Sequence, residues 1–203
     1  FVRERRAAPR DDLVSILAAQ QDGDVALDDH ELFMFFLLLL VAGNETTTNL
    51  LGNAVDALLA HPDVLERVAA DPGLVPGLVE ETLRWDGPIQ YLQRMATRDV
   101  EMHGRTIRRG DIVIPMLGSA NRDERRFPDA DRFDIERDTR GHVAFGFGNH
   151  FCLGASLARM EAASALTPLV PHLPQLARVR PEREFLDSYL VRGRTRLELR
   201  RAA

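Results

Sequence analysis

The chain contains one cysteine, Cys152, and the residues around it have the composition of a ligand-binding loop. Residues 145–154 read Phe-Gly-Phe-Gly-Asn-His-Phe-Cys-Leu-Gly, and a helical pattern begins at the cysteine. A thiolate at the start of a helix is stabilised by the helix dipole and by free backbone N–H groups, both of which lower the thiol pKa. The three glycines remove side chains nearby, so a flat and bulky ligand can approach the backbone.

Three roles are open to this cysteine: a buried apolar residue, a nucleophile, or a single thiolate ligand. One cysteine excludes an intramolecular disulfide and any zinc site with several cysteines. A Cys-His nucleophile is disfavoured because His150 is only two residues away, whereas a nucleophile and its base usually come from separate segments. The glycines and the histidine favour a thiolate ligand over a buried cysteine, which is the common role of a free cysteine.

A second candidate site interrupts a long apolar helical pattern at residues 42–47, which read Ala-Gly-Asn-Glu-Thr-Thr. Glycine inside a helix costs about 1 kcal/mol relative to alanine. An unpaired buried polar group costs a few kcal/mol. The segment is therefore either a functional site in the middle of a helix or a solvated face of that helix.

Two further groups are weaker signals. Glu81 and Arg84 share a helix face at a spacing of three residues, an arrangement that is more often a surface salt bridge worth about 0–1 kcal/mol. Arg94 precedes a predicted strand, where an arginine usually faces solvent. An arginine such as Arg94 could instead bind a carboxylate, because the planar guanidinium can bond both oxygens at once.

Composition sets the class of protein. The 203 residues are 45% hydrophobic and 28% charged, which is typical of a soluble globular protein. A net charge of −5 gives no reason to expect a nucleic-acid binder. All 26 basic residues are arginine, which is typical of a GC-rich bacterial genome. The longest apolar run, residues 32–42, is too short to span a bilayer and predicts a buried core helix instead.

The periodicity predicts a mainly α fold with a small β lobe (α+β). A helix is expected over 28–61, opened by Asp28 and Glu31 as a capping pair and ended by Pro62. Further helices are expected over 11–21, 63–70, 74–86 and 152–170, a β lobe over 94–117, an irregular segment over 118–141 and weak strands over 190–199. A long irregular segment inside a domain is usually functional.

Residues 145–154 resemble the haem-binding loop of the cytochrome P450 superfamily, in its soluble bacterial form. The resemblance implies that Cys152 is the axial thiolate ligand of haem b iron and that His150 contacts a haem propionate. Phe145, Gly146 and Gly154 would complete the loop against the haem. The implied fold is the cytochrome P450 fold, of which this chain is the C-terminal half, because family members have about twice as many residues.

The other motifs match the same family in the same order. Residues 42–46 are similar to its Ala-Gly-x-(Asp/Glu)-Thr pattern, where the helix opens slightly to form an oxygen-binding groove. The resemblance implies that Thr46 forms a hydrogen bond in this groove and that Glu45 feeds protons into it. The remaining assignments by resemblance are Ala42 and Gly43 as haem-contacting residues; Arg94 at a propionate; Glu81, Arg84 and Arg132 as a buried structural triad; and Ile89, Gln90 and Leu190 in the substrate pocket.

The resemblance implies a cytoplasmic haem-thiolate monooxygenase. Such an enzyme inserts one oxygen atom of O2 into a small organic substrate, by hydroxylation or epoxidation. Its electrons come from NAD(P)H through a reductase and a ferredoxin-type donor, with no nucleic-acid or membrane partner. Two alternatives remain: a truncated haem-binding fragment without activity, and a peroxygenase that uses hydrogen peroxide directly.

Overall fold

The structure is a computed structural model that describes residues 1–22, 25–180 and 182–202. It divides into two compact units, Phe1–Glu45 and Thr46–Ala203. The boundary falls within one continuous helix, α3 (Asp29–Ala60), which matches the long helix expected over 28–61.

The first unit holds α1 (Val2–Ala7), α2 (Leu13–Ala19) and a short antiparallel pair, β1 (Gln21–Asp22) with β2 (Val25–Ala26). The predicted capping pair opens α3. The backbone N–H of Glu31 donates to Asp28 at 2.8 Å, and that of Asp28 donates to the Glu31 carboxylate at 2.9 Å. These reciprocal bonds satisfy two backbone donors at the helix start.

The apolar run at residues 32–42 is largely exposed, contrary to the expectation of a buried core helix. Leu32 is fully buried, but Phe33, Met34, Leu38 and Leu40 are about half exposed or more. The reason is that the described residues of this unit place few neighbours against the run. By length and composition α3 is apolar enough to cross a membrane, and only 11% of its most apolar window is buried.

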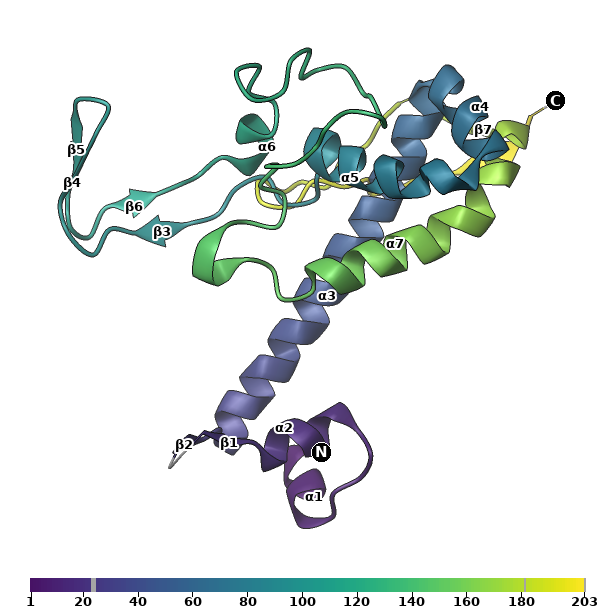
Figure 1. The fold of residues 1–203 in the computed structure, drawn as a ribbon. Coiled ribbons are helices and arrows are strands. Elements are labelled where there is room, and N and C mark those ends of the chain that lie inside the picture. The colour runs from purple at the N-terminus through teal and green to yellow at the C-terminus, as the bar shows by residue number, and fades with distance from the viewer. Residues whose placement is uncertain (23–24, 181, 203) are drawn as a thin grey trace. The chain divides into compact units, whose positions relative to one another are not determined.

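The second unit has a helical core (Figure 1). It is built from the C-terminal part of α3, α4 (Pro62–Ala70), the 3-10 turn η1 (Pro72–Leu74), α5 (Val75–Asp86), α7 (Ala155–Leu169) and η3 (Val170–Gln175). Pro62 ends α3 because it cannot continue the helix, and it becomes the first residue of α4. The apolar faces of these helices meet at Leu58, Val68, Leu78 and Leu166, which are fully buried.

The β lobe consists of two-stranded antiparallel pieces. β3 (Arg94–Met95) pairs with β6 (Ile112–Val113), and this ribbon leads out to the predicted hairpin of β4 (Val100–Met102) and β5 (Arg105–Ile107). His103 and Gly104 turn the hairpin with positive φ angles of 48° and 73°. A third pair joins β7 (Leu176–Arg178), which the sequence analysis missed, to β8 (Leu199–Arg201). Of the strands expected over 190–199, β8 forms at the end, while Val191 and Arg194 form isolated antiparallel bridges.

Residues 118–141 form the predicted irregular segment, which begins within the short helix α6 (Leu117–Ala120). The segment is nevertheless anchored, because Phe127, Ala130, Phe133 and Ile135 are buried. Its path against α5 is set by the backbone carbonyl of Ile135, which lies where a side chain on Gly77 would have to sit. This close approach requires glycine at position 77.

Two helical glycines provide a matched test of this packing. Gly77→Ala should lower the free energy of unfolding by about 1–3 kcal/mol, because the new methyl group overlaps the Ile135 carbonyl. Gly52→Ala, on α3 with no atom within 4 Å of its added carbon, should raise it by about 0.5–1 kcal/mol through helix propensity. Urea unfolding measures both values, and equal effects of the two substitutions would contradict the packing.

Candidate functional site

The loop around Cys152 folds back on itself. Gly146 and Gly148 adopt positive φ angles of 74° and 72°, which favour glycine. The second of these glycines begins the 3-10 turn η2 (Gly148–His150), which ends two residues before the cysteine. The backbone N–H of Cys152 donates to the Phe145 carbonyl at 2.9 Å and so closes the loop. His150 is exposed on η2.

The thiol of Cys152 is free and exposed, which argues against the buried-cysteine alternative. The following helix α7 starts at Ala155, with Gly154 as its N-cap, so the boundary predicted at 152 is three residues early. Cys152 therefore precedes the helix and lies close to its free N-terminal N–H groups.

The surroundings of the thiol fit a flat apolar ligand. Phe147 and Leu153 are 86% and 83% exposed, an unusual degree for large apolar side chains. An added carbon at Gly148 or Gly154 would meet no atom within 4 Å, so both glycines border open space. A single thiolate donor among apolar side chains and open glycine positions is the donor set expected for a thiolate-ligated porphyrin iron.

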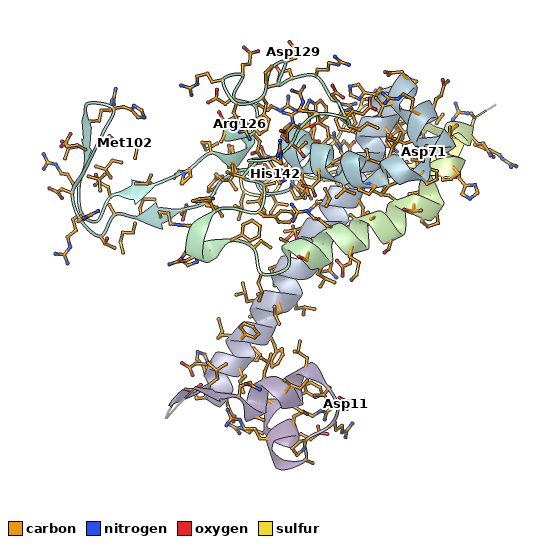
Figure 2. The ribbon with its side chains drawn as sticks, in the orientation of Figure 1. Asp11, Asp71, Met102, Arg126, Asp129 and His142 are labelled. Carbon is orange, nitrogen blue, oxygen red and sulfur yellow. The ribbon has the colours of Figure 1, made fainter. Side chains whose placement is uncertain are left out.

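A charged cluster that the sequence analysis missed holds the start of this loop. The carboxylate of Glu80 on α5 accepts hydrogen bonds from His142, at 3.0 Å, and from Arg159 on α7. The Arg159 guanidinium also lies 4.6 Å from the centre of the Phe145 ring. Figure 2 shows His142 among the residues beside α5. The only sequence signal for Glu80 is its position next to Glu81.

This cluster shifts two pKa values. Burial acts to raise the pKa of Glu80, but the hydrogen bonds from His142 and Arg159 outweigh it and lower the pKa to about 2. The hydrogen bond to Glu80 raises the pKa of Arg159, and the electrostatic interaction with Cys152 adds to this shift. Arg159 therefore keeps a positive charge within electrostatic range of the candidate ligand.

Glu81 and Arg84 are fully buried and form a two-pronged ion pair, with two N···O distances of 2.7 Å. Arg84 also donates to the carbonyls of Asn121 and Ala130 at 2.9 Å each, and to that of Arg132 at 3.3 Å. All five N–H groups of its guanidinium are thus satisfied. The pair fixes the irregular segment to α5, and it is a buried ion pair and not a surface salt bridge.

Asn121 connects this ion pair to the cysteine loop. Its backbone carbonyl accepts from Arg84, and its side-chain oxygen accepts from the backbone N–H of Val143 at 2.7 Å. The Val143 carbonyl in turn accepts from Gly146, at the first turn of the loop. Asn121 is 2% exposed, and no motif in the sequence marks it.

The side chain of Arg132 does not take the place expected for it in the triad. It is 71% exposed and lies 3.8 Å from Asp134, while only its backbone carbonyl reaches Arg84. Arg137 lies beside Glu81 instead, at 3.6 Å, with its side chain 10% exposed. The segment turns between the two residues, so that its carbonyls meet Arg84 and the later arginine points inward.

The residues assigned to an oxygen-binding groove lie along α3. Ala42, Gly43 and Glu45 end the first unit, all are exposed, and a carbon added at Gly43 would meet no atom within 4 Å. Thr46 is the first residue of the second unit and is partly buried. These residues all belong to the one helix α3, which continues through them to Ala60.

The remaining predicted residues lie in the second unit. Arg94 is exposed at the start of β3, with its side chain donating to the Gln93 carbonyl at 2.8 Å. Ile89, Gln90 and Leu190 come together although they are distant in sequence. The Gln90 N–H donates to the Leu190 carbonyl at 2.9 Å, and Ile89 forms an antiparallel bridge with Val191.

Comparison with known proteins agrees with this geometry. The family model described as Cytochrome P450 matches residues 73–182, which include the Glu81–Arg84 pair, the irregular segment and the cysteine loop. The chain belongs to the cytochrome P450 family. Membership implies a haem with a thiolate ligand, and Cys152 is the only cysteine in the sequence.

Similar P450s come from bacteria. The chain is 45% identical to Cytochrome P450 107B1 of Saccharopolyspora erythraea (100% of this chain, 51% of the relative). It is also 45% identical to Vitamin D(3) 25-hydroxylase of Pseudonocardia autotrophica (97% and 50%). The crystal structure of CYP109E1 from Bacillus megaterium in complex with testosterone matches at a TM-score of 0.92 and 39% identity (100% and 56%). The chain thus spans about half the length of the P450s it matches.

Paired substitutions distinguish the two arginines of the irregular segment. Arg137→Gln should lower the free energy of unfolding by about 1–3 kcal/mol, since it removes an inward cation and its bonds to the carbonyls of Pro128 and Asp129. Arg132→Gln should change it by at most about 0.5 kcal/mol, because that side chain is largely solvated. Urea unfolding measures both changes in the free energy of unfolding. A larger loss for Arg132→Gln than for Arg137→Gln would restore Arg132 as the third member of the triad.

Proposed function

We propose that this chain is the haem-thiolate portion of a monooxygenase that inserts one oxygen atom of O2 into a small organic substrate, while the other atom leaves as water. The observation that supports this most strongly is the exposed Cys152 thiol, held on a glycine-turned loop before α7 and bordered by exposed apolar side chains. Family membership and relatives named as a hydroxylase and as monooxygenases support the reaction class.

In this proposal each residue has a defined task. The haem, when bound, supplies oxygen activation, and Cys152 holds its iron as a thiolate. His150 and Arg94 would bind propionates, Phe145, Gly146 and Gly154 would complete the cysteine loop against the haem, and Ala42 and Gly43 would contribute further haem contacts. Thr46 positions a proton by hydrogen bonding, and the Glu45 carboxylate supplies it from solvent. Both carry groups suited to proton transfer, a hydroxyl and a carboxylate.

The proposal extends to partners and to the rest of the enzyme. Electrons come from NAD(P)H through a reductase and a ferredoxin-type donor, in the cytoplasm of a bacterium. The chain corresponds to the C-terminal half of the enzyme, and α3 is an internal helix of the complete domain rather than a membrane span. The match of the whole chain, α3 included, to P450 structures about twice as long supports this last point.

A specific observation favours one alternative, a haem-binding fragment without activity. The apolar face of α3 between Phe33 and Val41 is exposed, and exposed faces of this kind promote self-association. A peroxygenase is the other alternative, and the Glu45–Thr46 pair argues against it, since direct use of peroxide needs no proton delivery to O2.

The reduced, carbon-monoxide-bound absorption spectrum of the haem-loaded chain tests the proposal. The wild type should show the strongly red-shifted Soret band of thiolate ligation, and Cys152→Ala should lose it. Thr46→Ala, the matched control, should keep the band but divert electrons from NAD(P)H to hydrogen peroxide. A wild-type band without the shift would overturn thiolate ligation, and an active wild type whose Thr46→Ala variant is fully coupled would remove Thr46 from proton delivery.

A further inference from the structure

Two segments about 100 residues apart are joined into one ladder next to the cysteine loop. The N–H of Gln90 donates to the Leu190 carbonyl at 2.9 Å, and the N–H of Arg192 donates to the Pro88 carbonyl at 2.7 Å. Gly87, at the start of the first segment, lies against Ala144, and Leu92 at its end lies against Gly146. The ladder therefore borders the loop that carries the candidate ligand.

Charged side chains reinforce this ladder at one end. Asp86, the last residue of α5, is 3% exposed, and its carboxylate accepts a hydrogen bond from Arg192. Arg194 lies 3.7 Å from the same carboxylate and donates to Asp56 on α3. Both guanidinium groups stack on the Phe185 ring, at 4.1 and 3.8 Å. Because Asp86 is buried, it depends on these cations far more than an exposed carboxylate would.

Helix α3 holds both segments at the same place. The side-chain amide of Asn53, which is fully buried, donates to the carbonyl of Asp86 at 2.8 Å and to that of Arg192 at 3.1 Å. Next to Arg192, Gly193 packs so closely on Asn49 that an added carbon would overlap its side chain. Asn53, Asp86, Arg192 and Arg194 thus form one connected group, which we call the Asp86 clamp.

We propose that Asp86 is a positioning residue that fixes the 188–192 segment to the 87–91 segment, so that Ile89 and Leu190 present one defined surface to the organic substrate. This inference rests on the proposed function, because it assigns a substrate role to the two segments. Asp86 itself contacts no substrate in this account. It acts through Arg192 and the ladder.

The mechanical part of the proposal is tested without haem, by hydrogen exchange of the full chain. Asp86→Asn keeps the shape of the side chain but removes the charge, so the amides of Gln90 and Arg192 should exchange about tenfold faster. Arg196→Gln is the matched control, since Arg196 lies nearby in the same stretch and its ion-pair partner among the described residues is the exposed Glu198. Unchanged exchange in Asp86→Asn, or equal changes in the control, would overturn the clamp.

The substrate part is tested on the haem-loaded chain by titration with two probes. Testosterone, which is bound in a crystal structure of the related CYP109E1, serves as the organic probe for the surface proposed for the two segments. Imidazole binds iron directly and reports only on the haem. Asp86→Asn should weaken testosterone binding about tenfold and leave imidazole binding within about twofold of the wild type. Equal losses for both probes would mean a merely structural role and would overturn the proposal.

A second variant covers a failure of Asp86→Asn to fold. Arg192→Gln removes a partly exposed partner and leaves Arg194 beside Asp86, so it should shift exchange and testosterone binding in the same direction by a smaller factor. A wild-type chain that binds haem but responds to imidazole and not to testosterone would overturn the assigned substrate surface. A wild-type chain without a thiolate-ligated haem would overturn the proposed function instead, while hydrogen exchange still decides the clamp.

Discussion

The buried ion pair between Glu81 and Arg84 is the constraint on which the site-bearing unit depends. Two charges removed from water are stable together only when their remaining hydrogen-bonding groups are also satisfied. The chain meets this condition by bringing the carbonyls of Asn121, Ala130 and Arg132 to Arg84. The irregular segment has few regular backbone hydrogen bonds, yet it follows a fixed path. If the segment moved away from α5, the buried Arg84 guanidinium would lose its carbonyl acceptors.

The cysteine loop is connected to this ion pair and its helix from two sides. On one side Asn121 links the ion pair to Val143 by hydrogen bonds, and Val143 in turn binds the first turn of the cysteine loop. On the other side Glu80, the neighbour of Glu81 on α5, holds the loop through His142 and Arg159. The same helix ends at Asp86, where the Asp86 clamp begins. One helix of twelve residues therefore orients the thiol, its loop and the candidate substrate segments.

Sequence reasoning predicted the features that are local in the chain. The capping pair at the start of α3, the hairpin turned by His103 and Gly104, and the cysteine loop all depend on residues a few positions apart. It could not distinguish Arg137 from Arg132, because the choice depends on how an irregular segment turns against α5. Nor could it find Asn121 or the Asp86 clamp, whose partners are 22 to more than 100 residues away. The exposure of the 32–42 run was also mispredicted, since burial depends on neighbours that periodicity does not reveal.

The central claim, that the buried ion pair positions the cysteine loop through Asn121, has one most direct test. Asn121→Ala keeps the backbone carbonyl that Arg84 binds and removes only the side-chain oxygen that binds Val143. Residue-resolved hydrogen exchange should then be about tenfold faster at the amides of Val143 and Cys152, with the amide of Leu83 in α5 unchanged. Exchange at Val143 and Cys152 that matches the wild type would contradict the account.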